Sequence, residues 1–394
     1  MLNFILFVIV LAVLVPTAFL VLQLLFSLFE PARDRGAEDA DSDNFAVVIP
    51  AHDEADVIEA TLENLVAEMA DKRQLIVVAD NCSDDTATLC RAKGVTVLER
   101  NSDAERGKGF ALEFGVRHLL QREQPPAIVV FVDADCVVRP GSIGILIGKC
   151  RDTDGPVQGL YLMRSRGAGG IRTKIAEFAW VIKNQARPLG LKRLGLPCQL
   201  TGTGMAFPLE LLERVELGSA HIVEDMKLGI DCARLGSPPE FCPAAVVESY
   251  FPEAESSIES QRQRWEHGHL GMTFYGIRTL ALPAIANRDW RALAMALDLA
   301  IPPLSFLVLL LSSMTLLAAL AAWLFQTGSL TLWLLLIAIL SLGVSLLSSW
   351  YRFGREVISL GELLRFPGYV AAKIPMYLRY WFKRQLDWVR TDRD

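Results

Sequence analysis

The sequence lacks several patterns that would assign it to common protein classes. Its seven cysteines form no Cys-x-x-Cys pair, and the five histidines complete no zinc-binding pattern with them. The 39 basic residues do not outnumber the 45 acidic ones, so a net charge of −6 gives no general attraction to nucleic acid. We therefore expect no nucleic-acid partner, no zinc domain and no disulfide framework, and we expect the cysteines to be reduced and mostly buried.

Charge is also missing from the first apolar run, residues 2–29. This run is long enough to cross a hydrocarbon core of about 30 Å. A cleaved signal peptide is the alternative, but the run is too long, no basic residue precedes it and no Ala-x-Ala site follows it. We therefore predict a transmembrane helix over residues 1–30 and a charged linker over residues 31–44.

Two more apolar runs, residues 297–325 and 330–350, are each long enough to span a bilayer. Pro302 and Pro303 are expected to kink the first helix or delay its start. The loop at residues 326–329 is uncharged, whereas the chain beyond residue 351 is rich in basic residues. The positive-inside rule then predicts a multi-pass protein of the cell (inner or plasma) membrane with a cytoplasmic catalytic region. Two spans are expected within 297–351, and an amphipathic segment at 352–394 is expected to contact anionic lipid, a fourth span being the alternative.

Between these apolar segments, strand and helix patterns alternate. Buried-strand patterns occur at residues 45–50, 75–79, 95–98 and 128–133, and helical patterns occur at residues 57–69, 86–93 and 110–120. Such alternation predicts an α/β domain with a mostly parallel sheet and helices on both faces. We place this domain at residues 45–255.

Acidic residues follow the strands of this predicted sheet. Asp133 and Asp135 end the apolar strand at residues 128–133, and Asp80 ends the strand at residues 75–79. Open α/β sheets bind ligands at the carboxyl ends of their strands. Two carboxylates there could hold Mg²⁺ or Mn²⁺ together with a phosphate, and an acidic turn is the alternative reading.

Four further polar motifs follow Asp80 in the sequence. They are Gly107-Lys108-Gly109 before a helix, a small-residue turn at residues 201–204, the adjacent acids Glu224 and Asp225, and a capping box at residues 256–259. The Gly-Lys-Gly motif lacks the spacing and the hydroxyl of a Walker loop. The capping box starts a helix on which Gln261, Arg264 and Trp265 share one face. The alternative is an amphipathic helix at the membrane, and we predict interfacial helices over residues 256–296.

Taken together and in this order, the motifs resemble those of a membrane-embedded family 2 glycosyltransferase, such as the synthases of cellulose, hyaluronan and chito-oligosaccharides and bacterial exopolysaccharide transferases. The resemblance spans roughly residues 45–270, and it is carried by the acidic motifs together with Gln261-x-x-Arg264-Trp265. It implies a GT-A fold, a nucleotide-sugar donor and a divalent cation, Mg²⁺ or Mn²⁺.

The resemblance also implies roles for individual residues. Asp80 would bind the base of the nucleotide, Lys108 would support nucleotide binding, and Asp133 and Asp135 would hold the diphosphate through the cation. Asp225 would be the general base, with Glu224 as a supporting or capping acid. Trp265, Gln261 and Gly202 would lie near the acceptor, and Arg264 near the diphosphate. Three positions depart from the family pattern, namely Asp53, Ala79 and Val223. Because Ala79 replaces an acid, Asp80 is the one carboxylate left to recognise the base of the nucleotide.

The sequence thus predicts an inverting glycosyltransferase that uses a nucleotide sugar, with UDP as the expected nucleotide. Its acceptor would be a membrane glycan or a lipid-linked molecule, as in polysaccharide or exopolysaccharide synthesis. One alternative is a single-transfer enzyme acting on a ceramide or polyprenyl lipid. Another is a catalytically silent membrane scaffold of an export system, and export proteins could also be partners of the enzyme. The set of acids argues against silence.

Overall fold

We describe the protein from a computed structural model that covers residues 2–29, 44–165, 170–219, 223–252, 255–325 and 330–377, without the side chains of residues 2–9, 255–264 and 325. These residues form two compact units. The sheet unit comprises residues 44–165, 197–219, 223–252 and 255–268. The helical unit comprises residues 2–29, 170–196 and 269–377, with gaps as given above. Each unit is described by itself.

The described strands of the sheet unit form one eight-stranded sheet in the order β3-β2-β1-β4-β7-β6-β8-β5. The strands are β1 (Phe45–Ala51), β2 (Leu75–Asp80), β3 (Thr96–Arg100), β4 (Ile128–Phe131), β5 (Val137–Val138), β6 (Val157–Arg164), β7 (Met205–Pro208) and β8 (Glu240–Tyr250). Strands β1 to β4 pair in parallel, as do β6 and β8, whereas β7 runs antiparallel to β4 and β6, and β5 to β8. The predicted α/β class with a mostly parallel sheet is confirmed.

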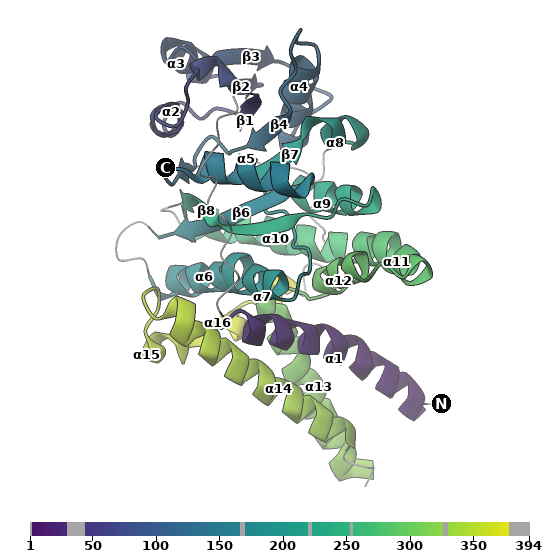
Figure 1. The fold of residues 1–394 in the computed structure, drawn as a ribbon. Coiled ribbons are helices and arrows are strands. Elements are labelled where there is room, and N and C mark those ends of the chain that lie inside the picture. Colours follow the sequence, from purple (N-terminus) through teal and green to yellow (C-terminus); the bar gives the residue numbers. More distant parts are fainter. Residues whose placement is uncertain are drawn as a thin grey trace. The chain divides into compact units, whose positions relative to one another are not determined.

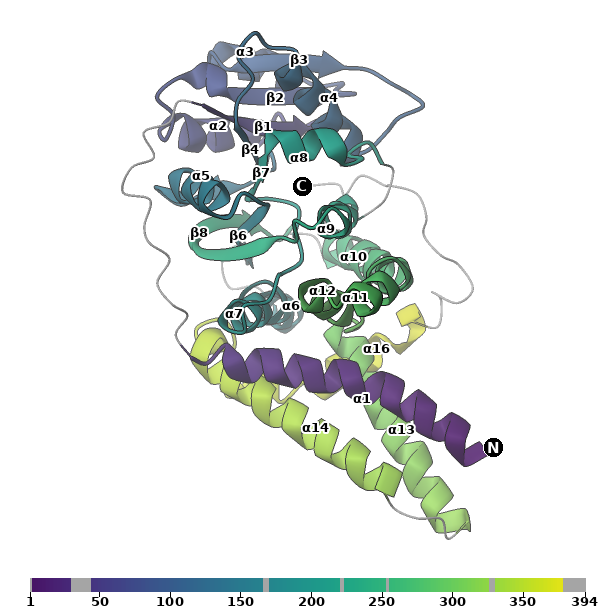
Figure 2. The same cartoon turned by 45° about the vertical axis from the view of Figure 1, so that its right-hand side comes forward.

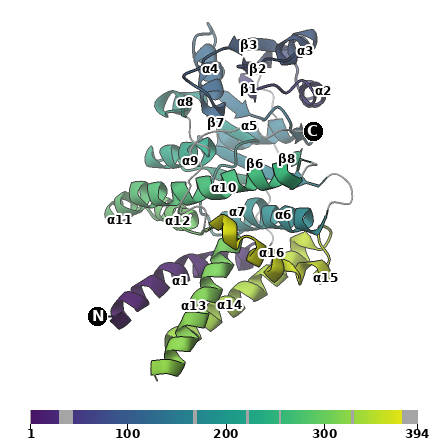
Figure 3. The same cartoon turned by 180° about the vertical axis from the view of Figure 1, so that it is seen from behind.

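Helices cover both faces of this sheet. The helices of the sheet unit are α2 (Ile58–Val66), α3 (Thr86–Ala92), α4 (Lys108–Leu120), α5 (Ser142–Thr153), α8 (Leu209–Arg214), α9 (Glu224–Arg234) and the first part of α10 (Glu255–Gly276), with a short 3₁₀ turn at Lys72–Gln74. Figures 1 and 3 show α2 and α3 on one side of β1 to β3 and α4 on the other. Figure 2 shows α8 near α4. On α4, a Cβ at Gly115 would lie 2.8 Å from Val48 Cγ1, so the small residue lets this helix pack closely on β1.

The expected elements up to residue 131 are all present, with ends shifted by a few residues. Their β-branched, fully buried strands carry a strong pattern, as in the burial of every residue of β2. The sequence reading assigned no strand after β4, and so it missed β5 to β8. Strand β5 is two residues long, and a segment of that length carries no readable alternation.

The helical unit contains α1 (Leu2–Phe26), α6 (Ile171–Val181), α7 (Arg187–Arg193), α11 (Leu282–Asn287), α12 (Trp290–Leu299), α13 (Leu304–Phe325), α14 (Leu330–Ser349), α15 (Leu360–Leu363) and α16 (Phe366–Ala372), with π-helical turns at Ile182–Ala186, Ile277–Ala281 and Trp350–Gly354. Helices α1, α13 and α14 lie side by side in Figures 1 to 3.

Two helices of the described chain, Leu304–Leu324 and Leu330–Gly354, are long and apolar enough to cross a membrane. The expected start of the first span at residue 297 is wrong, because residues 290–299 form the separate helix α12. Pro302 and Pro303 follow α12, and α13 begins at Leu304. The apolar part of α1 among the described side chains, Val10–Phe26, is shorter than those two spans. The linker, the loop at residues 326–329 and the chain beyond residue 377 lie outside the described residues.

A buried polar cluster joins three helices of the helical unit. Gln23 of α1 donates through Nε2 to Asp298 Oδ1 of α12 at 2.7 Å, and its Oε1 accepts from Arg187 Nε of α7 at 3.1 Å. Arg187 also donates to Asp298 Oδ1 at 2.7 Å. Gly190 permits this approach, because a Cβ there would collide with the backbone of Gln23. The three side chains satisfy one another where water is excluded.

Candidate active site

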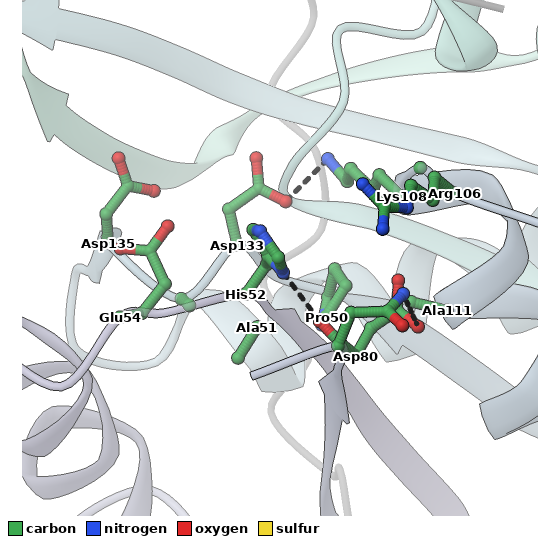
Figure 4. Close-up of a pocket in the computed structure, with 13 residues that line it drawn as sticks. Pro50, Ala51, His52, Glu54, Asp80, Arg106, Lys108, Ala111, Asp133 and Asp135 are labelled. Carbon is green, nitrogen blue, oxygen red and sulfur yellow. Dashed lines mark hydrogen bonds and ion pairs between the residues drawn. The ribbon is translucent and has the colours of Figure 1, made fainter. Parts of the chain in front are cut away.

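A pocket of about 390 Å³ opens at the carboxyl ends of β1, β2 and β4. Its lining residues are Pro50, Ala51, His52, Glu54, Asp80, Asn81, Arg106, Gly107, Lys108, Ala111, Asp133, Ala134 and Asp135. Figure 4 shows Asp133, Asp135 and Glu54 at one side of this pocket and Asp80 at another. The strand ends therefore bring together the acidic residues that the sequence marked, as the geometry of parallel sheets requires.

The turn after β4 presents Asp133 and Asp135. The Asp133 backbone N–H donates to Thr203 Oγ1 at 3.0 Å, and the Thr61 hydroxyl donates to the Ala134 carbonyl at 2.8 Å. These bonds anchor the turn to α2 and to the glycine-rich turn at residues 201–204. The short anchoring contacts fix where the two carboxylates stand.

A divalent cation fits this turn. One oxygen from each of Asp133 and Asp135 and the sulfur of Cys136 lie within 4.8 Å of one another. Burial, with the negative charges of Asp135 and Asp133, raises the pKa of the Cys136 thiol well above its usual range. A soft sulfur atom is in any case a poor ligand for a hard cation. What remains is a pair of hard carboxylate oxygens, the donors that Mg²⁺ and Mn²⁺ prefer.

Lys108, at the start of α4, links this turn to the acids of α9. Its Nζ lies 2.5 Å from Asp133 Oδ1 and 3.8 Å from Glu224 Oε1, and it donates to the Gly202 carbonyl at 2.8 Å. Burial opposes the lysine charge, but Asp133, Glu224 and Asp225 outweigh burial, and the pKa of Lys108 is raised. A permanently charged ammonium thus stands among the acids, where a phosphate would also be attracted.

Glu224 and Asp225 begin α9 and reach the same region. A Cβ at Gly202, whose φ is +96°, would lie 3.5 Å from both Asp225 Oδ2 and Lys108 Nζ. Gly202 therefore keeps the space beside these two groups open, and its positive φ suits glycine. Burial raises the pKa of Glu224 to about 7, with repulsion from Asp225 and Asp133 adding to burial and Lys108 opposing it. Glu224 is thus a carboxyl group that titrates near neutral pH, and Asp225 beside it is the other candidate for the general base.

Asp80 lies in the pocket but is already engaged. Its Oδ1 accepts from Arg100 Nη1 at 2.7 Å and from Asn81 Nδ2 at 3.2 Å. The sequence reading missed Arg100. The strand expected at residues 95–98 stopped before Arg100, whereas in the structure Asp80 and Arg100 are the last residues of β2 and β3 and are paired in register. Two strand ends that align in a parallel sheet place their side chains side by side.

The turn after β1 is bonded to the turn after β2 through acidic side chains and a histidine. Asp53, with φ of 51°, accepts from the Ser83 N–H at 2.6 Å, and Asp84 accepts from the Ala55 N–H at 3.0 Å. His52 Nδ1 donates to the Asp80 carbonyl at 2.7 Å. These bonds join the turns after β1 and β2, so the acids there are used to fix the backbone.

The helix predicted from the capping box is present as α10. The side chains of Gln261 and Arg264 lie outside the described part, and Trp265 is half-buried. Within the sheet unit, α10 packs against the residue that precedes the two acids of α9. A Cβ at Gly268 would lie 2.7 Å from Val223 Cγ1, so glycine allows this close contact.

Comparison with known proteins agrees with this site. Residues 42–268, more than half of the chain, match the family model described as glycosyltransferase like family 2. The probable glycosyltransferase YdaM of Bacillus subtilis is 26% identical over 235 residues, which are 57% of this chain and 54% of that protein. A poly-beta-1,6-N-acetyl-D-glucosamine synthase of Staphylococcus aureus is 24% identical over 233 residues, 56% of this chain and 53% of that protein. The chain spans about half the length of these relatives.

The fold has a counterpart among solved structures. A mannosyltransferase from Pyrobaculum calidifontis, solved in complex with GDP-Man and Mn²⁺, superposes with a TM-score of 0.50 over 85% of this chain and 97% of that chain, at 18% identity. At that identity the likeness establishes the GT-A fold alone. The pocket at the strand ends, the acidic turn after β4 and the family match over residues 42–268 lead to one conclusion: the chain belongs to glycosyltransferase family 2.

Proposed function

We propose that this glycosyltransferase is an inverting enzyme that moves a sugar from a nucleoside diphosphate sugar, with UDP as the expected nucleotide, to a membrane-associated glycan or lipid-linked acceptor. The observation that carries the proposal is the contact of Lys108 with Asp133 at 2.5 Å and with Glu224 at 3.8 Å. Lys108 thus connects the carboxylates suited to bind a diphosphate with the carboxylates suited to act as the general base. Direct displacement needs both sets within reach of one sugar.

The donor end of the mechanism rests on Asp133, Asp135 and Lys108. Mg²⁺ or Mn²⁺, when bound by the two carboxylates, would supply Lewis-acid stabilisation of the charge on the leaving diphosphate. Lys108 can exchange its contact with Asp133 for a phosphate oxygen, since an ammonium has three donors. Arg264, assigned by the motif on α10, would add a second positive charge to the leaving group.

The acceptor end needs a carboxylate that takes a proton from the attacking hydroxyl. The family motif selects Asp225, beside the open space at Gly202. Glu224, with a pKa of about 7, would tune the charge around Lys108. Trp265 and Gln261 would contact the acceptor sugar, because indole faces and amides suit sugar rings and hydroxyls. Inversion follows when one displacement is completed without a covalent enzyme intermediate.

The two apolar helices α13 and α14 support a membrane location for this reaction. The relatives include a polysaccharide synthase, which favours a glycan acceptor over a ceramide or polyprenyl lipid. Export proteins would then be partners, because a growing polar glycan needs a route across the bilayer.

The test is turnover by the purified full-length chain in lipid nanodiscs. We would supply a panel of labelled nucleotide sugars with Mn²⁺, with and without membrane lipid extract, and then size the labelled product. Transfer to a glycan or lipid supports the proposal, and product size separates repeated from single transfer. If the protein binds nucleotide but turns over none of the donors, the result would favour a catalytically silent scaffold.

A further inference from the structure

The environment of Asp80 bears on which nucleotide the donor carries, a question that rests on the proposed function. Asp80 ends β2 and lines the pocket, and 8% of its side chain is exposed. Figure 4 shows it away from Asp133 and Asp135. With the diphosphate at the paired acids, the base of the nucleotide would lie toward Asp80.

One oxygen of this carboxylate is held by the protein itself. Arg100 Nη1 donates to Oδ1 at 2.7 Å, and Asn81 Nδ2 donates to the same oxygen at 3.2 Å. In the described part of the chain, no hydrogen bond reaches the second oxygen. Asp80 therefore offers a ligand one strong acceptor rather than two.

Arg100 is fixed in this position by its other contacts. Its Nη1 donates to the Glu105 carbonyl at 2.8 Å, its Nη2 donates to Glu105 Oε2 at 2.7 Å, and its guanidinium lies 5.6 Å from the centre of the Phe110 ring. Its side chain is 8% exposed. A buried guanidinium with three partners does not leave Oδ1 when a ligand arrives, because the freed N–H groups belong to a buried side chain and would lose a charge-assisted bond.

The count of acceptors discriminates between bases. Uracil presents a single N–H, at N3, between two carbonyls, which matches one free carboxylate oxygen. Guanine presents two adjacent donors, N1–H and the amino group at C2, and these match a carboxylate with both oxygens free. Adenine and cytosine present a ring nitrogen acceptor at the corresponding position, which a carboxylate repels.

We propose that Arg100 is a specificity-determining positioning residue: by occupying Oδ1 of Asp80 it leaves one acceptor for the base and selects uracil over guanine. The amino group of guanine would find no partner at Oδ1. A buried donor without a partner is costly, and sites built on hydrogen bonds discriminate most strongly in this way.

The first experiment uses the unaltered full-length protein. Calorimetry with MnCl₂ compares UDP, N3-methyl-UDP, GDP and IDP, because IDP keeps N1–H and lacks the amino group. We expect UDP to bind about tenfold or more tighter than N3-methyl-UDP, and GDP to bind no tighter than IDP. GDP binding tenfold tighter than IDP would overturn the inference and leave the proposed function standing. Failure of all four nucleotides to bind would overturn both.

The second experiment changes the arginine. Arg100→Met removes the 2.7 Å bond to Oδ1 and leaves only the 3.2 Å bond from Asn81, so this oxygen can accept one more donor. GDP should therefore gain about tenfold over IDP, whereas a merely structural role would weaken all nucleotides in parallel. Arg100→Lys keeps a donor for Oδ1 and should keep the original order. Arg91→Met is the control, since Arg91 pairs with the exposed Glu99 and does not line the pocket. A parallel loss in Arg100→Met, with its fold intact by circular dichroism, would count against the proposal.

Discussion

Glu224 carries a charge that folding disfavours. Its pKa rises from an ordinary 4.5 to about 7, first because of burial and then because of Asp225 and Asp133. Between these two values the folded protein holds a proton that the unfolded chain releases, so folding stability falls as pH rises through this window. The destabilisation from the Glu224 charge is fully present above pH 7 and absent below pH 4.5.

We therefore expect the free energy of unfolding to fall by about 3 kcal/mol between pH 4.5 and pH 8 in the native protein relative to Glu224→Gln. Denaturant titration of both proteins without added metal, at several pH values, measures this difference. Stability curves that run parallel across the window would show that Glu224 titrates normally.

The base is the second prediction at this scale. Asp225→Asn keeps the shape of the side chain and removes its basicity, so turnover should fall on the order of 10²–10⁴-fold while nucleotide affinity is kept. Glu224→Gln should reduce turnover much less than Asp225→Asn does. A steady-state assay with calorimetry beside it measures both quantities. Normal turnover in Asp225→Asn, or loss of nucleotide binding, would assign the base elsewhere.

The third prediction concerns the cation. Asp133 and Asp135 offer hard carboxylate oxygens, so chelation should abolish transfer and Mg²⁺ or Mn²⁺ should restore it. Asp135→Ala should remove activity even in excess metal. Transfer is measured by the release of product. Full activity in excess chelator would contradict a role for the cation.

Some residues of the site could be predicted from the local sequence, and others could not. Asp80, Asp133 and Asp135 were predictable because each follows a buried apolar strand. Arg100 was not, since its role depends on the register between β2 and β3 and on the contact with Glu105, and neither is a spacing along the chain. The roles of Gln261 and Arg264 remain predictions.

Among the elements, α10 allows a matched test. Gly268→Ala places a Cβ 2.7 Å from Val223 Cγ1, so it should push α10 away from the acids of α9 and lower the free energy of unfolding by about 1–3 kcal/mol. On the same helix, a Cβ at Gly271 meets nothing within 4 Å. Gly271→Ala should therefore stabilise the protein slightly, by about 0.5–1 kcal/mol.

Thermal unfolding and turnover of the two alanine variants form the comparison. Turnover should fall in Gly268→Ala and stay unchanged in Gly271→Ala. Equal behaviour of the pair would mean that α10 adjusts freely and that its contact with Val223 is unimportant.

The predicted boundaries of an element agree with the structure where its sequence has a clear hydrophobic pattern. Fully buried, β-branched strands such as β2 were located within a residue. The start of α13 needed more than hydropathy, because the last residues of α12, from Leu297, lead directly into the apolar run, and Pro302 and Pro303 separate the two helices. The strands after β4 depend on pairing with distant partners, as β6 does with β8.

At the scale of the whole molecule, orientation in the membrane is a prediction from charge. The uncharged loop between α13 and α14 should face outward and the sheet unit should face the cytoplasm. A cysteine at Thr327 should react with an impermeant reagent in intact cells. A cysteine at Asp103, whose side chain is 99% exposed, should react only after the membrane is opened. The native protein gives the background, and the reverse pattern would invert the topology.

The cluster of Gln23, Arg187 and Asp298 has a consequence for the order in which the chain is made. Gln23 is synthesised 164 and 275 residues before its two partners. Until Asp298 has been made, the amide N–H group of Gln23 therefore lacks the acceptor that it has in the folded protein. Assembly of the helical unit must wait for residue 298, and a chain that stops before it should be a substrate for quality-control proteolysis.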